Sequence, residues 1–320
     1  MSSMKAVPMS SNKTSDARER VFLGRRYLLT GASRGIGQLA LRELIKLGAH
    51  VIAVARSQQQ LQTLAAELGE QVSPVTLDLS QPEQVNEWAA ELWSTYGPID
   101  GVIHNAGVDD FRAMTDMSSE AIISQVHLNL LAPLLINRAL LPQLIERERA
   151  DGQRGVIVHM SSVAGLIPVP FGSVYSATKS GLSIYAEALA AELKSASPRF
   201  VTLHPGFVHG VGMHEAHKAV AGRAPLTLGG TTDQRVIRAL IRALRDPKPG
   251  IVSRVVNNIP IRPLTTLYLL LPRLARALAR HIVYPYLAKV AQARRTHGQS
   301  PMSETTPPPI IAKTPEDERS

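Results

Sequence analysis

The chain of 320 residues contains no cysteine, which excludes disulfide bonds and thiolate metal sites and is compatible with a reducing compartment. Aromatic residues are also scarce, at 4%. No basic stretch carries the aromatic or groove-reading motif that accompanies nucleic-acid binding. We therefore expect no nucleic-acid partner.

Apolar segments are missing from both ends of the chain. Residues 1–20 are polar and rich in serine, without the apolar region of a secretory signal. They predict a disordered lead and a cytoplasmic protein. Residues 297–320, which include Pro307 to Pro309, predict a disordered tail. With 44% hydrophobic residues overall, the chain is long enough for one α/β core, which we place at residues 21–256.

Acidic residues are absent from one long span near the C-terminus. No aspartate or glutamate lies between Asp246 and Glu304, and the nine basic residues of this span equal the whole net charge of +9. These residues are Lys248, Arg254, Arg262, Arg273, Arg276, Arg280, Lys289, Arg294 and Arg295. The excess positive charge is therefore concentrated in the last quarter of the chain.

A glycine-rich turn near the start of the chain predicts a dinucleotide site. Tyr27 to Thr30 is expected to be a buried strand, Gly37 to Leu47 a helix with one apolar side, and His50 to Ala55 a second apolar strand. The turn Gly31-Ala-Ser-Arg-Gly-Ile-Gly37 joins the first strand to the helix. Glycines let the backbone approach a pyrophosphate, and a helix N-terminus favours an anion.

Two arginines favour NADP over NAD at this site. Arg56 follows the second strand, where an acidic residue would accept hydrogen bonds from the ribose hydroxyls of NAD. No acidic residue lies between Glu43 and Glu67. Arg56, together with Arg34 in the glycine turn, suits a 2′-phosphate. The alternative is that both arginines are solvated surface charges.

A serine, a tyrosine and a lysine further along the chain suit proton transfer to a carbonyl oxygen. Tyr175 and Lys179 lie one turn apart on a helix expected from about residue 173 to residue 190. A nearby ammonium group favours tyrosinate and lowers the tyrosine pKa. Ser162 would hydrogen-bond the substrate oxygen, with Ser161 as the next candidate for that role. On its own, a Tyr-x-x-x-Lys pair would more simply be two residues on a helix surface.

Together these motifs resemble the short-chain dehydrogenase/reductase family, from Leu23 to Val255. The resemblance implies a single doubly wound, Rossmann-like α/β domain with a parallel sheet of about seven strands, and NADP(H) as the cofactor, with NAD(H) less favoured. It implies catalytic roles for Ser162, Tyr175, Lys179 and Asn129. It implies cofactor contacts from Gly31, Ser33, Arg34, Gly35, Ile36, Gly37, Arg56, Asp78, Leu79, Asn105, Ala106, Gly107, Tyr175, Lys179, Pro205, Gly206 and Val208.

The resemblance also implies particular roles for some of these residues. Asp78 would contact the adenine ring, the Asn105-Ala-Gly107 motif would steady the central sheet, and Lys179 would hold the nicotinamide ribose. Asn129 would hold a water that links Lys179 to solvent. One departure is Gly210, because the family often has a threonine there that contacts the nicotinamide carboxamide.

The segment from Phe207 to Gly230 is expected to be the substrate lid. Its histidines, His209, His214 and His217, are expected to be solvated, and with Glu215 as the only acidic residue nearby no metal site is predicted. Five apolar residues predict an apolar pocket on the other side: Val163, Leu166, Ile167, Val169 and Phe171. The only evident anchors for a charged substrate are lid basic residues such as Lys218 and Arg223.

Residues 257–296 extend beyond the usual end of the family and predict basic amphipathic helices. One helical face would carry Leu267, Leu271, Leu274, Leu278 and Ile282, and the opposite face Arg273, Arg276 and Arg280. Pro272 is expected to begin a helix and Pro285 to end it. The apolar face could cover the substrate cleft, pack on a neighbouring subunit, or lie on an anionic membrane as a peripheral anchor.

The predicted function is hydride transfer between NADP(H) and a carbonyl or secondary alcohol of an apolar, lipid-, steroid- or retinoid-like substrate, in a homo-oligomer. A 3-ketoacyl-thioester reductase is the alternative within the enzymes, since a basic surface could meet an acidic carrier protein. A non-catalytic NADP(H)-binding sensor or scaffold is the alternative of another class. An epimerase or dehydratase of the extended relatives is less consistent with the short glycine spacing. The sequence leaves the substrate and the favoured direction open.

Overall fold

The computed structural model describes most of the chain between residues 20 and 297. Within these limits it leaves out 153, 194–197, 214–216, 218–228, 247–250, 259–261, 272, 275–276, 278–279 and 282. The predicted disorder of residues 1–20 and 297–320 therefore lies outside the described residues, except at two positions. Arg20 begins a short 3-10 helix, η1 (Arg20–Phe22), and His297 ends the last helix.

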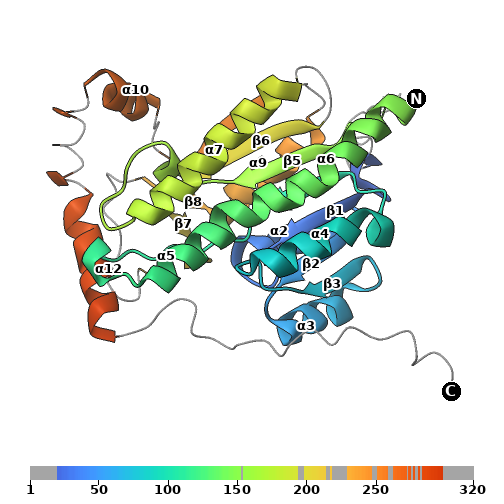
Figure 1. Ribbon diagram of the computed structural model, residues 1–320, viewed down its shortest axis with the longest axis horizontal. Coiled ribbons are helices and arrows are strands. Elements are labelled where there is room, and N and C mark those ends of the chain that lie inside the picture. Colours follow the sequence, from blue (N-terminus) through green and yellow to red (C-terminus); the bar gives the residue numbers. More distant parts are fainter. Residues whose placement is uncertain are drawn as a thin grey trace, which may run out of the picture.

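A parallel sheet of seven strands forms the centre of the molecule, as the sequence predicts (Figure 1). The strand order is β3-β2-β1-β4-β5-β6-β9. The strands are β1 (Arg26–Thr30), β2 (His50–Ala55), β3 (Val72–Thr76), β4 (Gly101–His104), β5 (Val156–Met160), β6 (Arg199–Pro205) and β9 (Ile251–Val256). A separate parallel pair, β7 (Val208–His209) with β8 (Thr231–Thr232), was not expected. The chain therefore has the doubly wound α/β fold, and the strand order reverses direction between β1 and β4.

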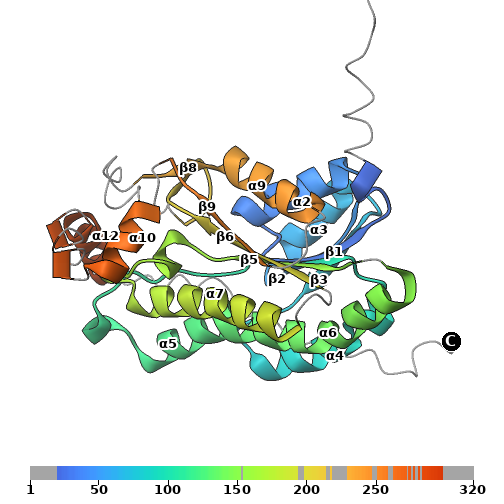
Figure 2. The same cartoon turned by 90° about the horizontal axis from the view of Figure 1, so that it is seen from above.

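Helices cover both faces of the sheet (Figure 2). One face carries α2 (Gly35–Lys46), α3 (Gln58–Leu68) and α9 (Asp233–Arg245). The other face carries α4 (Pro82–Tyr96), α5 (Ser119–Val126), α6 (Ala132–Asp151) and α7 (Ser173–Leu193). Two helices of the C-terminal extension, α10 (Arg262–Leu270) and α12 (Tyr284–His297), lie at one end of the molecule.

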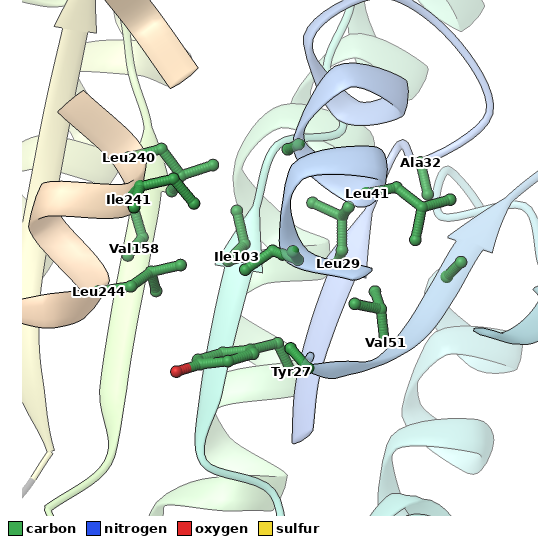
Figure 3. Close-up of a cluster of buried hydrophobic side chains, with 14 of the residues drawn as sticks. Tyr27, Leu29, Ala32, Leu41, Val51, Ile103, Val158, Leu240, Ile241 and Leu244 are labelled. Carbon is green, nitrogen blue, oxygen red and sulfur yellow. The ribbon is translucent and has the colours of Figure 1, made fainter. Parts of the chain in front are cut away.

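The packing of the core explains why the sequences of the central strands are continuous apolar runs. Strands β1 and β2 are buried on both faces, so neither face carries the polar residues of a solvated strand. Figure 3 shows Leu41 of α2 packed against Leu29, and Leu240 and Leu244 of α9 near Val158. This packing fixes the strand ends, from which the site residues project.

One continuous helical run, Ser119–Glu148, is long and apolar enough to cross a membrane by length and composition alone. Its apolar side is part of the protein core, because Ile136, Leu140 and Leu144 are fully or almost fully buried against the sheet. The run also carries Asn129 in a π-helical turn. These observations are typical of the central helix of a globular domain.

Two histidines are buried side by side under α6. His104 and His159 stack with ring centroids 5.2 Å apart, and Asn137 bridges them. Its Oδ1 accepts from Nε2 of His104 at 2.7 Å, and its Nδ2 donates to Nε2 of His159 at 3.2 Å. Burial lowers the pKa of His104 to about 4, against a smaller upward effect of the bond to Asn137.

This burial predicts acid-sensitive stability. The unfolded chain protonates His104 near its ordinary pKa of 6.5, whereas the folded chain resists protonation down to about pH 4. The contribution of His104 to the free energy of unfolding is therefore fully present above pH 6.5 and is lost as the pH drops towards 4. The loss from His104 alone is about 2 kcal/mol on going from its ordinary pKa to about pH 5. Urea unfolding of wild type and His104→Gln across this range should give a shallower pH slope in the variant. Equal slopes would contradict the prediction.

The C-terminal extension departs from the sequence prediction at Pro285. Instead of ending a helix, Pro285 is the second residue of α12. A proline fits the first turn of a helix because its missing N–H would have no intrahelical partner there. Pro272, Arg276, Leu278 and Ile282 of the predicted amphipathic pattern lie outside the described residues.

Candidate active site

The predicted site residues meet at one edge of the sheet, where the parallel strands end. Gly31 to Gly37 follow β1, Arg56 follows β2, and Asp78 and Leu79 come shortly after β3. Asn105 to Gly107 follow β4, and Ser162 is the second residue after β5. Pro205 ends β6, Gly206 follows it, and Val208 begins β7. Tyr175 and Lys179 on α7 and Asn129 in the π-helical turn complete the set. This edge is where ligands bind in doubly wound folds.

The glycine turn can accept a phosphate because its backbone is closely packed and its helix start is uncapped. A Cβ on Gly37 would lie 1.9 Å from the carbonyl oxygen of Gly31. Gly31 itself has φ +68°, which disfavours any other residue. Helix α2 begins two residues earlier than predicted, and its N-cap, Arg34, makes no side-chain capping bond. The first-turn N–H groups of α2 are thus available to an anion, so this part of the chain fits a dinucleotide.

Thr30 and Asn105 tie the glycine turn to the next strand. The hydroxyl of Thr30 accepts from the backbone N–H groups of Asn105 and Ala106, both at 3.1 Å. In return, Nδ2 of Asn105 donates to the carbonyl oxygens of Thr30 and Gly31 at 3.1 and 3.2 Å. These four bonds cross the gap between β1 and β4 and fix the position where the strand order reverses.

The adenosine end of the expected site carries two arginines and one aspartate. Arg34 is exposed and Arg56 is half-buried, and neither forms an ion pair with a carboxylate in the described part of the chain. Oδ1 of Asp78 accepts from the N–H and the hydroxyl of Ser80 at 3.0 and 2.8 Å. The two guanidinium groups therefore remain available for a further anion.

Ser162, Tyr175 and Lys179 lie together beside β5. The Ser162 side chain lies near enough to the Tyr175 phenol to lower its pKa, and its oxygen accepts from the N–H of Ala164 at 3.1 Å. Nζ of Lys179 lies 5.8 Å from the centre of the Tyr175 ring and donates to the carbonyl oxygen of Met160 at 2.8 Å. Ser161 instead bonds the carbonyl oxygen of Lys179 and the hydroxyl of Ser183. The geometry therefore favours Ser162 over Ser161 next to the tyrosine.

Asn129 holds the loop after β4 against α7. Its Oδ1 accepts from the N–H of Val108, and its Nδ2 donates to the carbonyl oxygen of Val108, both at 2.9 Å. Nδ2 also donates to Thr178 at 3.2 Å. A Cβ on Gly107 would lie 3.1 Å from both Asn129 Oδ1 and Lys179 Nζ. Since both amide hydrogens are used, a water linking Lys179 to solvent would have to bond Asn129 through an acceptor.

The protein's own groups raise the pKa of Tyr175, which differs from the expectation that Lys179 lowers it. Burial is the main cause and the nearby Asp109 carboxylate adds to it, while the bond to Ser162 acts in the opposite direction. Burial lowers the pKa of Lys179 to about 8, partly opposed by Asp109. Desolvation is the largest influence on both groups because both are deeply buried.

Helix α12, which lies at one end of the molecule in Figure 1, packs on the tyrosine from the far end of the chain. Tyr286, Leu287 and Val290 are buried in one cluster with Phe111 and Tyr175. Phe171 and Val169, two of the predicted pocket residues, pack against the same cluster. Phe171 packs on Tyr284 with the two rings tilted by 46° and their centroids 5.0 Å apart, and Phe207 meets Tyr286 edge-on at 6.0 Å. The extension thus covers the predicted active-site end of its own chain.

Phe171 adopts a strained backbone conformation within this cluster. Its φ of +61° is unusual for a bulky residue. Its carbonyl oxygen accepts from the N–H of Arg112 at 2.9 Å. A Cβ on the next residue, Gly172, would lie 2.4 Å from the Phe111 ring. Strain of this kind persists where the surroundings determine the conformation, and it is concentrated at functional sites.

His217 corrects the expectation that the lid histidines are solvated. It is only 2% exposed, and its Nε2 donates to Oδ1 of Asp109 at 3.1 Å. His209 is exposed, as expected, whereas His214, Lys218 and Arg223 lie outside the described residues. Within the described ranges no group of three potential metal ligands is found. Sequence reasoning missed Asp109, although its place directly after the Asn-Ala-Gly-Val segment could have drawn attention to it.

Gly210, which stands in place of the usual threonine, has φ +97° and is exposed. A threonine would be strained in this conformation. The side chain that packs on the neighbouring turn is Asn257, whose amide would meet a Cβ on Gly206 at 2.6 Å. Its Nδ2 is buried without a hydrogen-bond partner. Asn257 lies just after β9, and no pattern in the sequence indicates this contact.

Comparison with known proteins agrees with the family that the motifs resemble. The family model described as short chain dehydrogenase matches residues 25–220. Ketoacyl reductase HetN of Nostoc sp. is 34% identical over 241 residues, which cover 74% of this chain and 80% of the relative. A closed form of serine dehydrogenase complexed with NADP+ superposes with a TM-score of 0.63 at 26% identity, covering 74% of this chain and 95% of that one.

A second solved structure carries the other dinucleotide. The 3-ketoacyl-(acyl-carrier-protein) reductase from Brucella melitensis, complexed with NADH, superposes with a TM-score of 0.63 at 26% identity, covering 74% of this chain and 98% of that one. Similar folds therefore hold either dinucleotide, and the choice between them depends on individual side chains.

Proposed function

The chain belongs to the short-chain dehydrogenase family, and on this basis we propose that it transfers hydride between NADP(H) and a carbonyl or secondary alcohol of an apolar substrate. The observation that carries the proposal is the grouping of Ser162, Tyr175 and Lys179 beside β5, at the sheet edge that also holds the glycine turn and the uncapped start of α2. The domain limits of 21–256, with the extension at 257–296, are part of the same proposal.

In the proposed reaction, Tyr175 supplies a proton to the substrate oxygen. The nicotinamide of the cofactor supplies the hydride to the carbonyl carbon. Tyr175 donates its phenolic proton to the oxygen as negative charge develops, and the Ser162 hydroxyl stabilises the same oxygen by a hydrogen bond. Lys179 then stabilises the phenolate that remains, and a proton taken up from solvent beside Asn129 restores the phenol through Lys179. Removing water from this enclosed site strengthens each of these interactions.

An apolar substrate is proposed because of the groups that surround the tyrosine. Phe111, Phe171, Tyr286, Leu287 and Val290 all contribute to the cluster around Tyr175. Such an apolar surface can bind a hydrocarbon chain or a ring system, and it offers few ionic or hydrogen-bond partners for a charged substrate. A 3-ketoacyl thioester is the second candidate, supported by the ketoacyl reductase among the relatives.

Purified protein offered ketones and 3-ketoacyl thioesters separates these candidates. Oxidation of NADPH, followed by its absorbance, should occur with apolar ketones. Turnover of acyl thioesters alone would favour the second candidate. Tight NADPH binding without turnover of any carbonyl would favour a cofactor-binding sensor or scaffold. A protein that binds neither dinucleotide would contradict the proposed function.

The preference for NADP(H) is tested by Arg56→Ala. Loss of one charged hydrogen-bond partner should weaken binding of a 2′-phosphate by about 1.5–3 kcal/mol, or about tenfold or more in Kd. Calorimetric titration should show this loss for NADPH and little change for NADH. His50→Ala, a change at the other end of β2, is the control and should affect neither. Equal weakening for both cofactors would count against a phosphate contact.

We also propose that the region around α10 can lie on an anionic membrane. Leu270, Leu271 and Leu274 are 73%, 53% and 49% exposed, and Arg273 and Arg280 are exposed beside them. Apolar side chains flanked by arginines are typical of an interfacial segment. Since α12 packs on its own chain, this role belongs to α10 and the residues that follow it. A homo-oligomer is proposed as well.

Sedimentation with vesicles tests the membrane proposal. Wild type should pellet with vesicles that contain anionic lipid, and less so in high salt. Changing Arg273 and Arg280 to Gln should weaken binding, since each basic residue contributes on the order of 1 kcal/mol near such a surface. The matched control changes two exposed arginines of α9, Arg238 and Arg242, and should pellet like wild type. Failure of the wild type to sediment at low salt would contradict the proposal.

A further inference from the structure

A buried histidine near the end of β6 contacts the proposed catalytic serine without having a part in the reaction scheme. His204 is only 1% exposed, and its two ring nitrogens reach two different segments of the chain. Nδ1 lies 3.2 Å from the carbonyl oxygen of Ser162, and Nε2 lies 2.9 Å from the hydroxyl oxygen of Ser253 in β9. Since both polar atoms of this buried ring have partners, the ring is held in one orientation.

The two partners of His204 select a single tautomer of its ring. A carbonyl oxygen can only accept a hydrogen bond, so Nδ1 must carry the hydrogen that it donates to Ser162. Burial lowers the pKa of His204, against a smaller upward effect of the bond to Ser162, so the ring is neutral at pH 7. Nε2 of the neutral ring then accepts from the hydroxyl of Ser253. One tautomer therefore satisfies both contacts, and the serine of β9 supports the ring from behind.

The backbone around Ser162 is fixed partly by its own turn and partly by β6. Within the turn, the carbonyl oxygen of Ser162 accepts from the N–H of Gly165 at 2.9 Å. Just before the turn, the N–H of Ser161 donates to the carbonyl oxygen of Leu203 at 2.8 Å. His204 supplies the side-chain contact between β6 and the turn itself. Its loss would leave the carbonyl of Ser162 held only from within the turn.

The same histidine stands directly before the turn that is expected to lie beside the nicotinamide. Pro205 and Gly206 follow His204, and the N–H of Gly206 donates to the carbonyl oxygen of Val256 at 3.1 Å. His204 therefore joins the residue expected to hold the carbonyl oxygen, Ser162, to the turn expected to hold the hydride donor. Hydride transfer depends on the distance between these two, and a misplacement on the order of 1 Å can lower the rate by about 100-fold.

We propose that His204 is a positioning residue, which fixes Ser162 relative to the Pro205-Gly206 turn through the hydrogen bond from Nδ1, with Ser253 holding the ring in place. This inference rests on the proposed function, because it acts through the serine that the reaction scheme uses. It adds two residues to the Ser162, Tyr175 and Lys179 set, and neither of them touches the substrate.

The first test compares three variants in carbonyl reduction. His204→Leu removes the donor to Ser162, so kcat should fall by about tenfold while the Kd for NADPH stays close to wild type. His204→Asn keeps a side-chain N–H near the position of Nδ1 and should restore most of the lost kcat. Ser253→Ala leaves the donor but removes its support, so its loss should be smaller than that of His204→Leu. Wild-type kcat in His204→Leu would overturn the proposal, as would an asparagine variant no better than the leucine one.

The second test is a double-mutant cycle that separates positioning of Ser162 from general damage to the fold. If His204 acts through Ser162, adding His204→Leu to Ser162→Ala should lower kcat little further, whereas losses that multiply would overturn the proposal. Thr202→Val is the matched control. Thr202 is two residues earlier on β6 and is also 1% exposed, and its variant should keep the wild-type kcat. Rates are expressed per NADPH-binding site, so a partly unfolded preparation does not imitate the expected loss.

A failure of the proposed function is distinguishable from a failure of this inference. If wild type reduces none of the carbonyls offered, the reaction assignment fails, and positioning of the turn is then measured by amide hydrogen exchange. The N–H groups of Ala164 and Gly165, which both bond Ser162, should exchange faster in His204→Leu than in wild type and return towards wild type in His204→Asn. The N–H of Gly69, bonded to the end of α3, should not change. Unchanged exchange at Ala164 and Gly165 would overturn the inference.

Discussion

Replacing Tyr175 by phenylalanine should abolish nearly all turnover while leaving cofactor binding close to wild type. The variant loses only the phenolic oxygen and keeps the ring that packs against Phe111. Loss of a positioned proton donor should lower kcat by about 10²- to 10⁴-fold. Rates should be measured with the best carbonyl substrate from the screen, and NADPH affinity by fluorescence titration.

Two comparisons make this result interpretable. Lys179→Ala should impair both turnover and NADPH binding if Lys179 also holds the ribose, so it should differ from Tyr175→Phe in the binding measurement. Tyr185→Phe removes a phenol on the same helix, beside the buried His159, and should retain turnover. Substantial activity in Tyr175→Phe would eliminate the proposed proton donor.

Replacing Gly37 by alanine should nearly eliminate dinucleotide binding. The added Cβ would lie 1.9 Å from the carbonyl oxygen of Gly31 and 2.6 Å from the amide of Asn105. The first of these atoms belongs to the backbone, so the turn has to open and the N-terminus of α2 has to move. We expect NADPH affinity to fall by at least about 100-fold, equivalent to about 3 kcal/mol. Calorimetric titration measures this directly.

Gly181→Ala provides a matched control for that change. Gly181 is also helical, and a Cβ there meets only the Leu130 side chain, at 3.3 Å. Alanine is favoured over glycine within a helix by about 0.5–1 kcal/mol, so this variant should fold normally and bind NADPH as wild type does. Wild-type NADPH affinity in Gly37→Ala would show that the turn does not hold the phosphates.

The covering of the active-site end by α12 has a structural consequence for substrate entry. Tyr286, Leu287 and Val290 are buried against the residues around Tyr175. The exposed contact between Arg295 and Asp116 is a surface ion pair at 3.7 Å and adds little stability. Movement of α12 costs the burial of these apolar side chains, and a bound apolar substrate can replace part of that burial.

The sequence alone determined the central part of this protein because its signals are local. Consecutive residues that are buried on both faces of a parallel strand must all be apolar, so β1 and β2 could be located from the sequence. The glycine turn follows from backbone sterics within seven residues. Tyr175 and Lys179 share a helical face because they are one turn apart. The same short-range patterns predicted the doubly wound fold and carried the resemblance to a known family.

Only the tertiary structure decided which distant residues surround the tyrosine. Asp109 and His217 carry no distinguishing pattern in the sequence, and their contact joins residues that are 108 positions apart. Helix α12 covers the site although the pattern around it favoured a helix ending at Pro285. The direction of the Tyr175 pKa follows from burial, which no spacing reveals. Contacts between segments far apart depend on the packing of the whole chain, and desolvation depends on everything that encloses a group.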